Sequence, residues 1–144
     1  MIFDKQSLFS DAQAITADAA STNVIDLGPT GTPVGGVAPL ARDLGAGGPV
    51  PLRIQVVEAF NNLTSLNVIL QACDAEGFGS GVEVLAETGE VALADLLAGK
   101  VLMPQYVPQG ANKRYLRLYY DVTGTAPTTG KITAGLVTGH QTNG

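Results

Sequence analysis

The sequence predicts an all-β fold, an antiparallel β-sandwich built as a single domain over residues 1–144. Residues 52–57 and 65–72 alternate apolar and polar side chains with period two, as half-buried strands require. Glycine, proline or asparagine bounds each further candidate strand, and helical patterning is almost absent. A chain of 144 residues can bury roughly 70% of the surface that it exposes when unfolded, so it needs no disulfide or metal to fold.

The two alternating segments are joined through Asn61-Asn62-Leu63, which predicts neighbouring antiparallel strands. Further strands are expected at residues 81–88, 101–107, 113–123 and 131–138. Pro104 lies inside one of them and cannot donate a hydrogen bond, so 101–107 is expected to be an edge strand or an extended loop. A short helix is expected at 91–98, followed by Gly99 as its C-terminal cap.

Residues 28–51 are half glycine and proline, a composition that sustains neither a helix nor a central strand. Loops of this length inside compact domains are usually functional or disordered. We expect this Gly/Pro-rich loop to become ordered against a neighbouring subunit. The alternative is a flexible surface loop without a role.

Residues 1–20 are predicted to form an extended N-terminal arm. Its apolar residues Phe3, Leu8, Phe9 and Ile15 are irregularly spaced, and the β-branched Ile15-Thr16 pair disfavours a helix. Two aromatic side chains near a terminus need a covering surface, so we expect Phe3 and Phe9 to pack onto a neighbouring subunit. In the alternative, the arm packs back on its own sandwich.

The charge composition favours contact with other proteins. Charged residues make up 15% of the chain, against about 25% in ordinary globular domains, and a neutral surface is easily desolvated. The net charge of −5 argues against nucleic acid as a partner, because phosphate binding requires a basic face. No apolar run is long enough to predict a membrane span, and the start of the chain has no signal-peptide pattern.

No catalytic, metal-binding, cofactor-binding or small-molecule site is predicted. The single histidine, His140, lies in a polar tail that we expect to be solvated. The single cysteine, Cys73, is expected to be a small buried hydrophobe. The two residues are far apart in the sequence, which disfavours a metal site. Glu83, Glu87 and Glu90 are expected to form a solvated acidic rim. The sequence therefore predicts a protein that is not an enzyme.

One basic and aromatic cluster stands out at residues 113–120, where Arg117 and Tyr119 should share the outer face of a strand. Arginine and tyrosine are enriched at protein interfaces, although a solvated strand face and a site for single-stranded nucleic acid are alternatives. The candidate interface residues are Phe3, Leu8, Phe9, Arg114, Arg117 and Tyr119.

Strand pattern alone fits both a jelly roll and an immunoglobulin-like sandwich. The chain has no tryptophan and only one cysteine, which disfavours the immunoglobulin-like topology. A jelly roll also leaves few exposed edges for its number of strands. We therefore expect a jelly roll.

Residues 8–28, 113–120 and 132–136 resemble the capsid cement, or decoration, proteins of short-tailed bacteriophages. The resemblance implies a small jelly-roll protein that forms a dimer or trimer on the outer surface of an icosahedral capsid. It also implies that the protein is made in the bacterial cytoplasm and bridges major capsid protein subunits in the virion. The alternative function is a carbohydrate- or receptor-binding phage surface module, which the absence of tryptophan disfavours.

Overall fold

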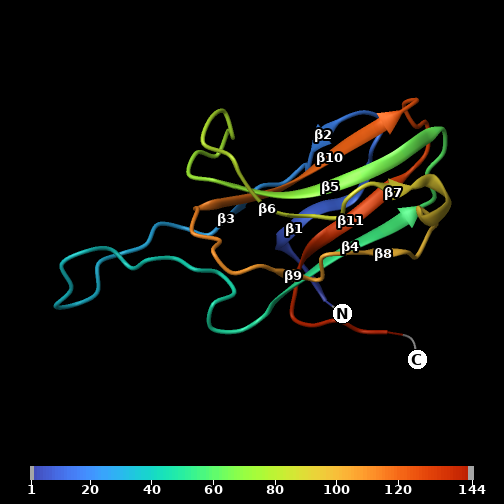
Figure 1. Ribbon diagram of the computed structural model, residues 1–144. Helices are drawn as coiled ribbons and strands as arrows, with labels where there is room; N and C mark the ends of the chain where they lie inside the picture. The colour runs from blue at the N-terminus through green and yellow to red at the C-terminus, as the bar shows by residue number, and fades with distance from the viewer. Residues whose placement is uncertain (1, 143–144) are drawn as a thin grey trace.

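The computed structural model describes residues 2–142 as two facing β-sheets (Figure 1). The first sheet consists of β1 (Phe3–Ala14), β4 (Val50–Glu58), β8 (Val101–Leu102), β9 (Tyr106–Val107) and β11 (Lys131–Val137). The second consists of β2 (Ala19–Ala20), β3 (Ile25–Asp26), β5 (Leu63–Cys73), β6 (Glu83–Glu87), β7 (Val91–Ala92) and β10 (Tyr115–Gly124). A 3₁₀ turn at Leu93–Asp95 follows β7. Met1 of the predicted arm, and Asn143 and Gly144 of the predicted tail, lie outside the described residues.

The strand order is β1-β11-β4-β8 in the first sheet, where β9 also pairs with β4. It is β2-β10-β5-β6 in the second, where β3 pairs with β10 and β7 with β5. Every pair is antiparallel, so the predicted antiparallel β-sandwich is confirmed. No helix within residues 2–142 is long and apolar enough to cross a membrane.

The jelly-roll topology stays a prediction, and the nested pairing of the strands supports it. The first strand pairs with the last, β2 and β3 pair with β10, β4 pairs with β8 and β9, and β5 pairs with β6 and β7. The chain is therefore one long antiparallel hairpin folded across two sheets, as in a double-sheet roll.

The core lies between the two sheets and follows the predicted alternation. Leu52, Ile54 and Val56 of β4 are buried, and so are Leu66, Val68, Leu70 and Ala72 of β5. From β10, the second sheet adds Leu116, Leu118 and Tyr120. Burial of these side chains removes apolar surface from water, which is the main force holding the sheets together.

A buried polar contact joins the two sheets. The Tyr120 hydroxyl lies 2.7 Å from Ser10 Oγ, which donates a hydrogen bond to Gln13 Oε1 at 2.6 Å. Burial raises the pKa of Tyr120, so its hydroxyl remains protonated at neutral pH. The buried oxygen is therefore hydrogen-bonded, as the interior of a protein requires.

The N-terminal segment is extended, as predicted, but residues 3–14 form an integral strand of the first sheet. Its pairing with β11 is interrupted by register shifts between Phe3 and Leu8, between Leu8 and Ser10, and between Ser10 and Gln13. Phe9 is 0% exposed and belongs to the core of its own chain. The prediction that Phe9 packs onto a neighbouring subunit is therefore wrong, and the alternative, packing on its own sandwich, holds for this residue.

Two other predicted elements differ from the structure. The segment 101–107 is divided into β8 and β9, which both pair with β4 at the edge of the first sheet, on either side of Pro104. This agrees with the predicted edge position. The helix expected at 91–98 is wrong: β7 pairs with β5, one 3₁₀ turn follows, and Leu96 is fully buried.

Candidate protein-interaction surfaces

The residues expected to be chemically inert are engaged in packing. Cys73 is buried at the end of β5, where its thiol donates to the Ser80 carbonyl at 3.1 Å. His140 is half-buried rather than solvated: Nε2 donates to the Gln105 carbonyl at 2.7 Å, and the ring meets Tyr106 edge-on at 5.2 Å. Within residues 2–142, no group of three or more His, Cys, Asp and Glu side chains is arranged to hold a metal ion.

The outer face of β10 carries an arginine and aromatic patch formed by Phe78, Arg117 and Tyr119. The Arg117 guanidinium lies over the Phe78 ring, 4.2 Å from its centre, and 5.7 Å from the centre of the Tyr119 ring. Arg117 Nε also donates to Gln71 Oε1 of β5 at 2.8 Å. These contacts hold the side chain against the sheet, which lowers the entropy that it would lose on binding a partner.

Arg114 does not belong to this patch and forms an ion pair with Asp26. Its Nε and Nη2 donate to the two carboxylate oxygens of Asp26 at 2.7 and 2.8 Å. The hydrogen bonds from Arg114, with a further one from the Gly28 amide, lower the pKa of Asp26 to about 2. Arg114, which directly precedes β10, is therefore paired with the last residue of β3.

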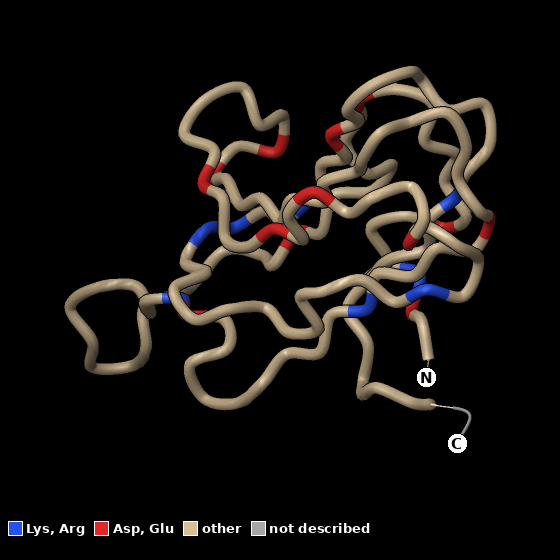
Figure 2. Tube along the Cα trace, turned by 45° about the vertical axis from the view of Figure 1, so that its right-hand side comes forward, with Lys and Arg blue, Asp and Glu red and all other residues tan. Residues whose placement is uncertain are grey.

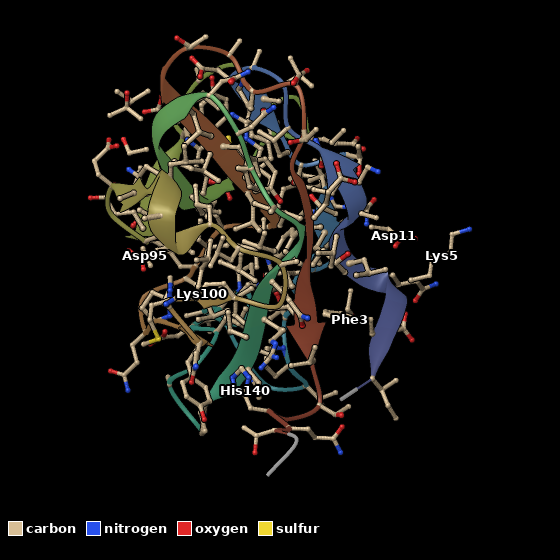
Figure 3. All side chains as sticks on the ribbon, turned by 90° about the vertical axis from the view of Figure 1, so that its right-hand side faces the viewer. Phe3, Lys5, Asp11, Asp95, Lys100 and His140 are labelled. Carbon is tan, nitrogen blue, oxygen red and sulfur yellow. The ribbon has the colours of Figure 1, made fainter. Side chains whose placement is uncertain are left out.

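Phe3 and Leu8 line an open groove along β1, with a volume of about 490 Å³, and the segment around Asn23 forms its other wall. Both side chains are half-buried, whereas Lys5 and Asp11 are exposed at the rim. Figure 3 shows the labelled Phe3, Lys5 and Asp11 along the β1 side of the sandwich. Phe9 also borders this groove but is fully covered. The sequence-predicted interface residues are thus divided between this groove, the β10 patch and the Arg114–Asp26 pair.

The Gly/Pro-rich segment after β3 is the third surface. It extends away from the two sheets before returning to β4 (Figure 1). The described residues 29–41 are all exposed, and Val34 and Val37 are as exposed as in an extended chain. In Figure 2 the projecting part of this segment, residues 29–41, is tan throughout, because it has no acidic or basic residue.

A family model described as Bbp16 matches residues 9–137 of the chain. The chain belongs to the Bbp16 family. Bbp16 is a phage-related family of structural proteins. No curated protein sequence matches this chain.

The match to Bbp16 includes the β10 patch and the projecting loop, but it begins after Phe3 and Leu8. Sequence reasoning overlooked Phe78, because Gly77–Gly81 resembles an ordinary turn, and Phe78 has the positive φ of 50° that such a turn allows. The exposed valines of the loop were also overlooked. Their signal is in the sequence: no charged residue occurs between Asp26 and Arg42.

Proposed function

We propose that this Bbp16 protein is a non-enzymatic virion component that binds the outer surface of an icosahedral phage capsid. There it bridges neighbouring major capsid protein subunits and stabilises the shell. The observation that carries the proposal is the Bbp16 match over residues 9–137. The sandwich fold and the weakly charged surfaces described above support it, because such surfaces are easily desolvated against another protein.

Stabilisation follows from binding linkage. A protein that binds the assembled shell and not its dissociated subunits stabilises the shell by roughly 2.7 kcal/mol per site when its free concentration is a hundredfold above Kd. Many copies on one particle multiply this effect. We propose that the protein, made in the bacterial cytoplasm, acts as a dimer or trimer, because an oligomer can contact several capsid subunits at once.

The test uses purified protein and shells of its phage that lack it. We expect stoichiometric co-sedimentation with the shells and a higher temperature of shell rupture. The same shells incubated with an unrelated acidic β-sandwich protein provide the control for non-specific adsorption. Absence of binding at micromolar protein would refute the proposal, and a reproducible glycan-array signal without shell binding would favour the carbohydrate- or receptor-binding alternative.

A further inference from the structure

The tip of the projecting loop has a defined conformation. The Gly36 amide donates to the Pro33 carbonyl at 2.9 Å, and the Leu40 amide donates to the Gly31 carbonyl at 3.0 Å. Gly35 has a φ of +80° at the third position of the turn that begins at Pro33, where positive φ favours glycine. We name residues 31–40 the finger.

The finger exposes apolar side chains and has no charge. Val34 is 108% exposed, Val37 104% and Leu40 60%, so no other part of the described chain covers the two valines. No residue between 27 and 41 carries a charged side chain. The finger is therefore an apolar projection whose burial requires no desolvation of an ion.

The base of the finger is fixed to the sandwich. Arg42 donates to the Lys113 carbonyl at 3.2 Å and to the Gly28 carbonyl. Asp43 Oδ1 accepts a hydrogen bond from the Gly110 amide at 2.7 Å. A projection with a fixed base loses less conformational freedom on binding than a free loop, which makes it suited to insertion into a partner.

A second copy of this chain is a poor partner for the finger. Each of five open pockets on residues 2–142 has at least one charged side chain in its lining, and these side chains include Asp4, Asp11, Asp18, Arg42 and Lys100. Covering such charges with valine would remove their hydration and supply no hydrogen bonds in return. Even the groove along β1, where Phe3 and Leu8 lie, has Lys5 and Asp11 exposed at its rim, so none of these five pockets is free of charge. The uncharged finger complements a cleft without charged residues.

We propose that the finger inserts into an uncharged, apolar cleft on the outer surface of the major capsid protein. This inference rests on the proposed function and names the part of the chain that makes the central contact. Exposed valine and leucine, rather than ion pairs, then provide the attachment. Binding should therefore resist salt, because screening weakens contacts between charges and leaves apolar contacts intact.

The test measures Kd for shells that lack the protein, using the doubly substituted chain Val34→Asp with Val37→Asp. We expect Kd to rise at least about tenfold, while the melting temperature of the free protein stays that of the wild type. Val84→Asp provides the matched control, because Val84 is an exposed valine (55%) on β6, away from the finger. Val34→Thr with Val37→Thr should weaken binding less than the aspartate pair, since it removes apolar contact without adding charge.

Each outcome decides between distinct conclusions. Equal binding by wild type and both finger variants would overturn this inference and leave the proposed function intact. Absence of binding by the wild type would overturn both. If the aspartate variants dissociate an oligomer of the free protein, the finger binds a second copy, and the capsid cleft is wrong. Wild-type binding that falls steeply between about 0.05 M and about 0.5 M salt would also overturn the apolar contact.

Discussion

Replacing Phe9 by Ala should destabilise the folded chain by about 3–5 kcal/mol. The ring is 0% exposed and lies in the core cluster between the sheets, so its removal deletes a large buried surface and leaves a cavity. Domains of this size are usually stable by only about 5–15 kcal/mol, so the loss is a large share of the total. At about 2–4 °C per kcal/mol, the melting temperature should fall by roughly 10 °C.

The assay is thermal unfolding of the free protein followed by circular dichroism, with urea denaturation as a second measure. Phe3→Ala is the matched control, because Phe3 lies on the same strand but is only half-buried. We expect this control to lose less than about 1.5 kcal/mol. A Phe9→Ala melting temperature within about 2 °C of the wild type would show that Phe9 lies outside the core of its own chain.

Tyr120→Phe should lower the free energy of unfolding by about 1 kcal/mol in urea denaturation, because it removes the buried hydrogen bond between the sheets. Arg114→Ala should raise the pKa of Asp26 from about 2 toward 3.8, which NMR titration of the carboxyl group measures. A carboxyl group whose pKa is lowered by folding stabilises the protein at pH values above its pKa in the unfolded chain. The wild type should therefore lose this stabilisation as the pH falls from about 4 to about 2. Gly135→Ala should lower the melting temperature, because its Cβ would lie 2.8 Å from a backbone oxygen of β1, whereas Gly139→Ala has open space and should not.

Three results would contradict these expectations. A Tyr120→Phe variant as stable as the wild type would show that the hydroxyl contributes no net stabilisation. An Asp26 titration that is unchanged by Arg114→Ala would remove the ion pair as the cause of the lowered pKa. Equal melting of the two glycine variants would mean that β1 does not press closely on β11 at Gly135.

The sequence predicted the regular strands well because their pattern is local. In β4, β5 and β10, every second side chain faces the opposite sheet, so burial follows directly from the alternation. The N-terminal strand lacks this regular alternation, because its register shifts, and the positive φ of 45° at Ala12, break the period of two. Its apolar residues are irregularly spaced in sequence although β1 pairs with β11.

The candidate interface was harder to predict than the fold. Alternation placed Arg117 and Tyr119 on an outer face, but nothing local indicated that Phe78 would contribute its ring to the same patch. Arg114 was grouped with them by proximity in sequence, whereas its partner is Asp26, which lies far away along the chain. Such contacts depend on which strands become neighbours, and that is a property of topology rather than of local pattern.

The distribution of charge links the finger to the rest of the molecule. An exposed apolar tip would ordinarily promote aggregation of the free chain. This chain has a net charge of −5, so two copies that approach each other are repelled at long range, while the finger itself carries no charge. Acidic residues on the body therefore oppose the close approach of two copies, whereas the finger brings no charge of its own to a contact. The same residue distribution therefore favours attachment to a different protein over self-association through the finger.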